Sequence, residues 1–232
     1  MPVITINGEY GSGAPEVGVE VARTLGMDYV DRLVLAEASR RIRVPVAALA
    51  QREERSPTLG ERAARLLQRV LERSALAGGD PYFGASMDAL LLQPYPEGTH
   101  EPAQEMDDRR FVEAISQAIR TLAQSDNIVV VGRASNLVLQ DHPRALHIGL
   151  VAPYERRLAV IMEREHLDRP RAERHIAQVE RARDVYYRRF FKTDPSTPHQ
   201  YHLVLNTGLL TFHQAADFIV HLARLYWPPA TP

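Results

Sequence analysis

Three glycines near the N-terminus are the residues with the clearest chemical use. Gly8, Gly11 and Gly13 follow a β-branched run over residues 3–7, and an apolar pattern of helical spacing begins directly after them. Glycines let the backbone approach an anion closely, and the free N–H groups at a helix start point toward it. The order strand, glycine turn, helix therefore predicts a phosphate-binding loop. The loop residues expected at the phosphates are Gly8, Gly11, Ser12, Gly13 and Ala14.

This loop lacks the two reactive side chains of the complete Walker signature, G-x-x-x-x-G-K-[ST]. Ala14 stands where the lysine belongs, and Pro15 stands where the hydroxyl belongs. The missing lysine removes a charge-assisted contact worth roughly 1.5–3 kcal/mol. The missing hydroxyl removes the usual protein ligand of Mg²⁺. A tight connection between strand and helix, with no ligand, is the alternative that the loop alone leaves open, and Pro15 suits a first helical turn in either case.

A second charged pattern lies on a helix predicted over residues 171–191. Arg181 and Arg188 are seven residues apart and share one helix face, whereas Arg183 falls within the apolar stripe. A guanidinium on an apolar stripe must reach water or an anion. Arginines on a closing lid would neutralise the phosphoryl group during transfer. Viewed alone, the pattern also fits a salt-bridged surface helix.

Charged residues also follow two predicted strands. Asp31 and Arg32 come after the strand pattern that ends at Val30, and Arg133 comes directly after the apolar run that ends at Gly132. Ligands of open parallel sheets bind outside the carboxyl ends of the strands. These three side chains are therefore candidates for contact with a substrate. Asp31 could instead, or in addition, cap the helix that follows it.

The elements that must position these residues alternate along the chain. Strand patterns cover residues 3–7, 27–30, 127–132, 145–151 and 201–205, and helical patterns cover residues 17–25, 107–124, 154–165, 171–191 and 210–226. Such alternation predicts an α/β fold with a mainly parallel sheet and helices on both faces. Residues 43–105 differ, because Arg- and Leu-rich helical patterns are followed there by a loop rich in Gly, Pro and Asp. We predict a helical insertion over that range.

The composition of the 232 residues is that of an ordinary globular protein, with 45% hydrophobic and 25% charged residues. The formal net charge of −1 provides no field that would gather nucleic acid or anionic lipid. The absence of cysteine excludes disulfides and thiolate metal sites. No run approaches the roughly 20 apolar residues of a membrane span, and no signal-peptide pattern opens the chain. We expect a soluble, cytoplasmic protein without nucleic-acid or membrane partners, and the oligomeric state stays open.

Six stretches together resemble the cytidylate-kinase-like family of P-loop nucleoside monophosphate kinases. They are I-T-I-N-G-E-Y-G-S-G-A-P-E-V-G (4–18), Y-V-D-R (29–32), V-V-V-G-R (129–133), A-P-Y-E-R-R-L-A-V-I-M-E-R-E (152–165), V-E-R-A-R-D-V-Y-Y-R-R-F-F (179–191) and L-V-L-N-T (203–207). The resemblance implies a three-layer P-loop NTPase-type fold with an insertion and a lid. Its core would comprise residues 1–42 and 106–232, with the lid over about 166–195 and a monophosphate-binding insertion over 43–105.

The resemblance also implies a reaction, in which the γ-phosphoryl group of ATP moves to CMP or dCMP with Mg²⁺ as the cofactor. The glycine loop, Arg157 and Arg181 would hold the phosphates of ATP. Asp31, Arg32 and Arg133 would face the acceptor nucleotide, and Asp31 would orient it. Arg183 and Arg188 would neutralise the developing charge as catalytic residues. No side chain is assigned as a metal ligand.

Two further departures from the family pattern leave other functions open. Ala134 stands where well-studied cytidylate kinases carry an aspartate that helps to read cytosine, and Val160 replaces a basic residue expected one turn beyond Arg157. Together with Ala14 and Pro15, these residues leave open a degenerate P-loop protein. Such a protein would bind a nucleotide or a partner without transferring phosphate. A small-metabolite kinase on the same fold is a third possibility.

Overall fold

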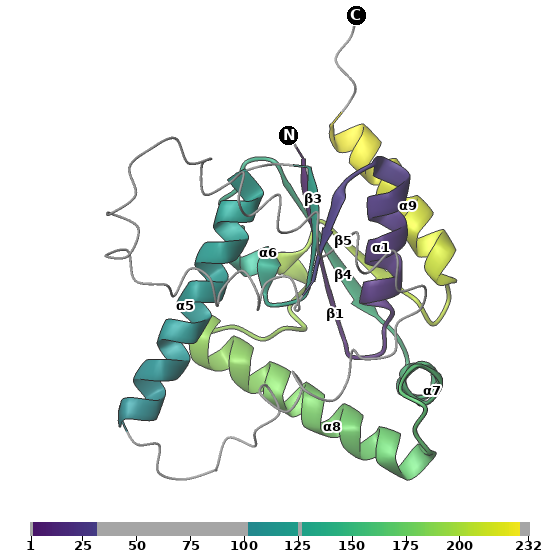
Figure 1. Cartoon of the computed structure of the whole chain (residues 1–232). Coiled ribbons are helices and arrows are strands. Elements are labelled where there is room, and N and C mark those ends of the chain that lie inside the picture. The colour runs from purple at the N-terminus through teal and green to yellow at the C-terminus, as the bar shows by residue number, and fades with distance from the viewer. Residues whose placement is uncertain (1, 32–101, 125–126, 228–232) are drawn as a thin grey trace, which may run out of the picture.

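Five parallel strands form the centre of the molecule (Figure 1). The computed structural model describes residues 2–31, 102–124 and 127–227. The strands are β1 (Val3–Gly8), β2 (Asp28–Val30), β3 (Ile128–Val131), β4 (Ala145–Val151) and β5 (Leu203–Asn206), and their order in the sheet is β2-β3-β1-β4-β5. Every neighbouring pair is parallel, which confirms the predicted α/β class. Arg32 and most of the predicted insertion over 43–105 lie outside the described residues.

Helices cover both faces of the sheet (Figure 1). Helices α1 (Ala14–Leu25) and α9 (Phe212–Tyr226) pack on one face, and α5 (Pro102–Gln124) and α6 (Ser135–Val138) pack on the other. Successive side chains of a strand point to opposite faces, so Ile4 and Ile6 enter the first core while Val3 enters the second. A sheet covered on both faces needs apolar side chains on both, which explains the continuous apolar strands of the sequence.

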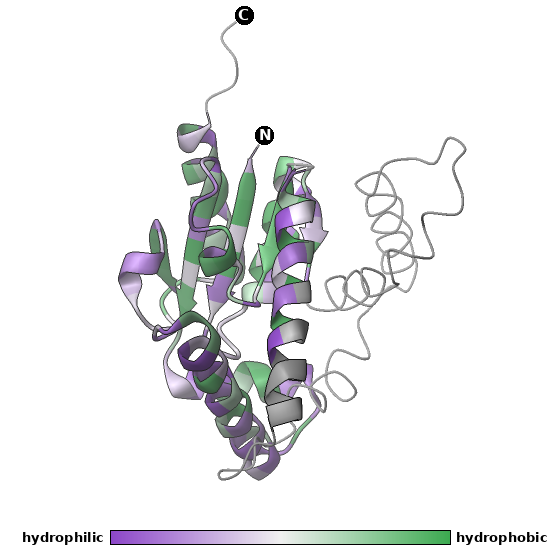
Figure 2. Cartoon of the chain, turned by 90° about the vertical axis from the view of Figure 1, so that its left-hand side faces the viewer, coloured by the Kyte–Doolittle hydropathy of each residue, from purple (hydrophilic) through white to green (hydrophobic). Residues whose placement is uncertain are grey.

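Helix α8 (Arg169–Tyr186) lies across the carboxyl edge of the sheet, below the strands in Figure 1. It packs on α7 (Tyr154–Arg164) through a small apolar cluster that includes Leu158, Ile161 and Ile176. The helix predicted over 171–191 is present, but it starts at Arg169 and its last five residues form a π-helical turn, η2 (Tyr187–Phe191). Figure 2 shows hydrophobic residues over the strands and mainly hydrophilic ones on this helix.

Helix boundaries follow local capping rules. Gly26 ends α1 in the left-handed conformation, which glycine adopts without steric cost. Thr211 and Gln214 form a capping box at the start of α9, which therefore begins two residues later than the helical pattern at 210. A short 3₁₀-helix, η3 (Pro198–Gln200), precedes β5. In the described part of the chain no helix is both long and apolar enough to cross a bilayer.

One polar pair is buried inside the sheet. His147 of β4 is 6% exposed, and its Nδ1 lies 2.8 Å from the Thr5 hydroxyl oxygen on the neighbouring strand. The His147 backbone N–H donates to His202 Nδ1 at 3.0 Å. Burial, with the neighbouring imidazole of His202 adding to it, lowers the pKa of His147 to about 4. His147 is therefore neutral in the folded protein at pH 7.

Candidate functional site

The loop between β1 and α1 has the predicted strand–turn–helix geometry. The chain leaves β1 at Gly8 and turns through Gly11 and Gly13, whose φ angles are 88° and 86°, before α1 begins at Ala14. The Ser12 N–H donates to the Glu9 carbonyl oxygen at 3.0 Å and closes the turn. The Thr207 hydroxyl donates to the Ser12 carbonyl oxygen at 2.8 Å. The loop is thus held from within and from the segment that follows β5.

The two central glycines are needed for packing as well as for their positive φ angles. A Cβ atom on Gly11 would lie 2.7 Å from the Arg157 carbonyl oxygen of α7. A Cβ atom on Gly13 would lie 2.2 Å from Cε1 of the Phe212 ring at the start of α9. Positive φ disfavours side chains at both positions independently of this crowding. The glycines therefore allow close helix contacts, which a phosphate-binding role alone would not require.

Several backbone amides of the loop remain available to an anion. Among the residues that the structure describes, the Gly11, Gly13 and Ala14 N–H groups donate no hydrogen bond. These groups lie at the N-terminal end of α1, where the helix dipole also favours negative charge. Pro15 has no N–H to contribute. The loop can therefore offer three backbone donors to a phosphate, without an ammonium group beside them.

The Tyr10 amide, by contrast, already holds an anion. Its N–H donates to Oε1 of Glu180, on α8, at 2.6 Å. Arg157 contacts the same oxygen, with its Nη1 at 3.4 Å, and also donates from Nη1 to the Tyr10 carbonyl oxygen at 3.1 Å. On its other side, Arg157 Nε lies 3.5 Å from Oε2 of Glu9. Arg157 thus lies against the loop, and its partners there are groups of the protein.

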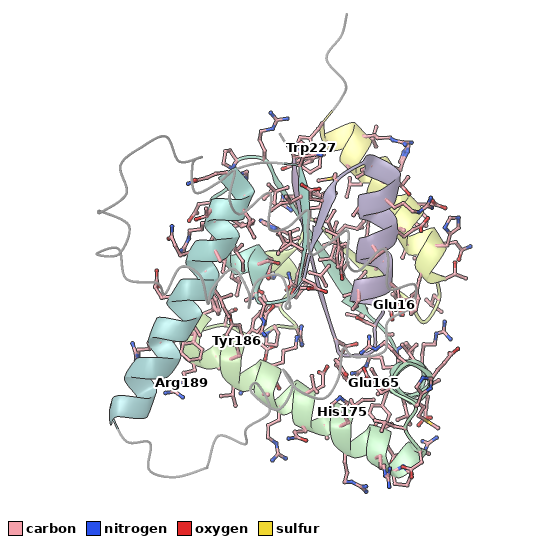
Figure 3. All side chains as sticks on the ribbon, viewed as in Figure 1. Glu16, Glu165, His175, Tyr186, Arg189 and Trp227 are labelled. Carbon is pink, nitrogen blue, oxygen red and sulfur yellow. The ribbon has the colours of Figure 1, made fainter. Side chains whose placement is uncertain are left out.

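A second cluster joins the Tyr10 side chain to α7 and α8. The Tyr10 hydroxyl lies 3.0 Å from His175 Nε2 and 3.4 Å from Oε1 of Glu165. The Arg164 guanidinium lies 5.3 Å from the centre of the Tyr10 ring and bridges Glu165, at 3.1 Å, and Glu16, at 3.5 Å. Figure 3 shows Glu16, Glu165 and His175 where α1, α7 and α8 approach one another. Tyr10 therefore fastens the loop to both helices.

These two clusters beside the loop contain more carboxylates than guanidinium groups. Four carboxylates of the described chain take part, and two guanidinium groups offset them: Glu9, Glu16, Glu165 and Glu180 against Arg157 and Arg164. A polyphosphate would be repelled by this excess in the conformation described here. The sequence patterns assign no role to Tyr10, Arg164, Glu165, His175 or Glu180. Arg157 and Arg164 are seven residues apart, which places both on one face of a helix. This spacing is the feature of the sequence that could have indicated a charged cluster there.

The three arginines predicted for the lid have other surroundings. The Arg183 guanidinium lies 5.4 Å from the centre of the Tyr187 ring. Arg188 is exposed and its Nη2 lies 3.3 Å from the Asp194 carboxylate, while Arg181 is exposed with no loop contact among the described residues. Their roles at the phosphates stay predictions, because the contacts described for Arg183 and Arg188 are with Tyr187 and Asp194.

Tyr187 connects the lid region to the sheet. Its hydroxyl donates to Oδ1 of the buried Asn7, in β1, at 3.4 Å, and burial raises the pKa of Tyr187. Asn7 Nδ2 donates in turn to the Ser135 hydroxyl oxygen at 3.1 Å. The side-chain Oδ1 of Asn136 is buried without a partner among the described residues. This polar group between β1, η2 and α6 was not predicted, because it is assembled from separate parts of the chain.

The acceptor residues predicted at the strand ends are brought to one edge of the sheet. Asp31 follows β2 and is buried, and Arg133 follows the adjacent strand β3. Gly132, Arg133 and Ala134 have φ angles of 80°, 57° and 51°. A left-handed conformation costs a residue other than glycine on the order of 1–3 kcal/mol and is often found at functional sites. This turn therefore supports a ligand-binding role at the end of β3.

The residues of the loop offer oxygen donors that suit Mg²⁺. Ser12 Oγ and Glu16 Oε2 are both buried without a hydrogen-bond partner in the described part of the chain. Mg²⁺ binds oxygen ligands, usually one or two carboxylates together with phosphate oxygens and water. A cluster of three or more His, Cys, Asp or Glu side chains is absent from the described residues. The loop thus fits a Mg²⁺ ion bound mainly through a nucleotide.

Comparison with known proteins identifies a family and a curated relative that matches part of the chain. The sequence model of the cytidylate kinase-like family matches residues 3–209. A curated protein, the uronate isomerase of Corynebacterium glutamicum, is 33% identical over 105 residues, which are 45% of this chain and 20% of that protein. The chain thus spans one fifth of the length of this relative.

A solved structure shares the fold. An uncharacterised protein from Eubacterium ventriosum superposes with a TM-score of 0.63 at 16% identity, covering 96% of this chain and 98% of that one. The shikimate kinase of Acinetobacter baumannii, in complex with shikimate, has a TM-score of 0.47 at 15% identity and covers 99% of this chain and 96% of that one. The superposition on the shikimate kinase is too weak to support any statement about the site.

Proposed function

The chain belongs to the cytidylate kinase-like family, and from this premise we propose that it transfers the γ-phosphoryl group of ATP to a nucleoside monophosphate. CMP and dCMP are the first acceptors to test. The observation that carries the proposal is the set of three open amides, those of Gly11, Gly13 and Ala14, at the start of α1. Backbone donors in this arrangement bind phosphate groups by hydrogen bonds and by the helix dipole.

The position of each residue suggests its role in the reaction. The open amides would orient the phosphates of ATP, because phosphoryl transfer depends mainly on positioning and charge stabilisation. Asp31 and Arg133, at the ends of neighbouring strands, would bind and orient the acceptor. Ser12 and Glu16 would supply oxygen ligands for Mg²⁺, which neutralises phosphate charge when bound. Arg183 and Arg188 would neutralise the charge that develops on the transferring group.

A binding or regulatory function without phosphoryl transfer is the second candidate. It is favoured by Ala14 and Pro15 at the reactive positions of the loop and by the excess of carboxylates around it. Such a protein would bind a nucleotide, or a protein partner, and would release no ADP. Replacement of Ala14 by lysine helps to separate the two, because a decayed enzyme is expected to gain activity from the restored cation.

A coupled assay of ADP release tests the proposal directly. The chain is incubated with ATP and Mg²⁺ and with CMP, dCMP, UMP, AMP or GMP in turn. We expect CMP or dCMP to raise ADP release above the rate without an acceptor. If no monophosphate does so, nucleoside monophosphate kinase activity is ruled out for these acceptors. Calorimetric titration with ATP then distinguishes a binding protein from one that does not recognise nucleotides.

A further inference from the structure

The carboxylate of Glu180 occupies part of the phosphate-binding loop. Its Oε1 accepts the Tyr10 N–H at 2.6 Å, and the contact joins residues that are 170 positions apart in the chain. The Glu180 side chain is only 26% exposed, although it carries a charge. The amides of Gly11 and Gly13, which follow Tyr10 in the same loop, have no acceptor among the described residues. A carboxylate from α8 thus uses the type of backbone donor that a phosphate would use.

Arg157 is held by the same oxygen. Its side chain is 11% exposed, and its Nη1 lies 3.4 Å from Glu180 Oε1 and 3.1 Å from the Tyr10 carbonyl oxygen. The position that carries the lysine in a complete Walker loop is Ala14, so no cation extends from the loop itself. In the described part of the chain, the Arg157 guanidinium contacts the backbone of this loop. Removal of the Glu180 carboxylate would leave Arg157 without one of its two anionic partners.

We propose that Glu180 competes with the phosphates for the loop, and that Arg157 replaces the missing lysine once a polyphosphate displaces Glu180. This inference rests on the proposed function, because it concerns the same loop and the same ligand. The displacement needs no covalent step, since one anion exchanges for another at the Tyr10 amide and at the Arg157 guanidinium. Two anions so close together would repel each other, so phosphate binding and the Glu180 contact exclude each other.

The exchange would also change how α8 is attached to the loop. His175, on the same helix, contacts the Tyr10 hydroxyl at 3.0 Å, so Tyr10 binds α8 through both its side chain and its amide. Displacement of Glu180 removes the second of these contacts. Helix α8 would then be freer to shift, and Arg183 lies on it. Phosphate binding would thereby leave α8, which carries Arg183, free to move.

The test measures the affinity of the full chain for inorganic tripolyphosphate and for ADP by calorimetry. Glu180→Gln keeps an acceptor for the Tyr10 amide but removes the charge, so we expect it to bind both ligands at least fivefold more tightly than the wild type. Glu173→Gln is the matched control, because Glu173 lies on the same helix and pairs with Arg169 instead. It should leave both affinities unchanged. Equal or weaker binding by Glu180→Gln would overturn the proposal.

Arg157 is tested by a pair of variants. We expect Arg157→Gln to weaken tripolyphosphate binding at least tenfold, and Arg157→Lys to recover most of that loss because the positive charge returns. Thermal unfolding monitors whether each variant is folded, since Arg157 is buried among several partners. Unchanged affinity in a folded Arg157→Gln protein would show that Arg157 does not replace the lysine.

A readout without nucleotide separates this inference from the proposed function. In the free protein, the Tyr10 amide resonance should shift in Glu180→Gln and stay in place in Glu173→Gln. An unshifted resonance would refute the Glu180 contact even if ATP binds and is turned over. A shifted resonance without polyphosphate binding by any variant would instead refute the proposed function, and the competition with it, while confirming the contact itself.

Discussion

Acidification should destabilise this protein through one buried histidine. His147 is 6% exposed and is held between Thr5 and His202, and its pKa is lowered to about 4 by burial and by the neighbouring imidazole. In the unfolded chain the same side chain would titrate near its ordinary pKa of about 6.5. Between these two values the unfolded state binds more protons than the folded state. The free energy of unfolding therefore falls as the pH falls through this window.

The size of the effect follows from the two pKa values. The difference between an ordinary pKa of 6.5 and a folded value of about 4 corresponds to about 3 kcal/mol, because each pKa unit is worth about 1.4 kcal/mol. The full contribution is present above pH 6.5 and is lost by about pH 4. A loss of about 3 kcal/mol is large against a typical domain stability of about 5–15 kcal/mol.

Urea unfolding at a series of pH values between 7.5 and 4 measures this loss. Carboxylates also titrate near the lower limit, so the informative quantity is the difference between wild type and His147→Gln. On going from pH 7 to pH 4, we expect the free energy of unfolding of the wild type to fall by about 3 kcal/mol more than that of His147→Gln. The variant lacks this loss because it has no imidazole at position 147 to protonate. His199→Gln, at an exposed position, is the control and should keep the pH dependence of the wild type. A difference that stays constant across the range would refute the burial of a neutral His147.

Three other substitutions test the loop and the lid. Gly13→Ala should lower the free energy of unfolding by about 2–5 kcal/mol in urea titrations. The added methyl group would clash with Phe212, and alanine would be strained at a positive φ. A loss below about 1 kcal/mol would contradict the packing described here. If Arg157 already supplies the charge-assisted contact with the phosphates, Ala14→Lys should change the KM for ATP by less than about threefold. A fall of the KM by about tenfold would indicate that the wild-type protein lacks such a cation. Arg188→Gln should change the free energy of unfolding by less than about 1 kcal/mol because its pair with Asp194 is exposed. The same variant should lower kcat for the best acceptor in the ADP-release assay, and an unchanged kcat would remove Arg188 from the catalytic residues.

The sequence by itself determined the class of fold and the position of the loop. Periodic apolar residues and local signals such as Gly26 define the strands and helices, because these depend on neighbours within a few positions. The run from Val3 to Gly13 specifies a strand, a turn and a helix start by the same local rules. The observed helix boundary differs from the predicted one where a capping residue sets the first turn, as Thr211 does for α9. The structure brings Asp31 and Arg133 to one edge because the carboxyl ends of parallel strands share it.

Only the tertiary structure decided what surrounds the loop. The contact of Tyr10 with Glu180 spans 170 positions, and that with Arg157 spans 147. A charged residue on a helix has the same local pattern whether it faces solvent, a phosphate or a backbone amide, so neither partner could be read from spacing. Which partner a charged residue contacts depends on how α7 and α8 pack against the end of β1. This packing sets the distances between the charges and excludes water around them, and both determine the strength of the interaction.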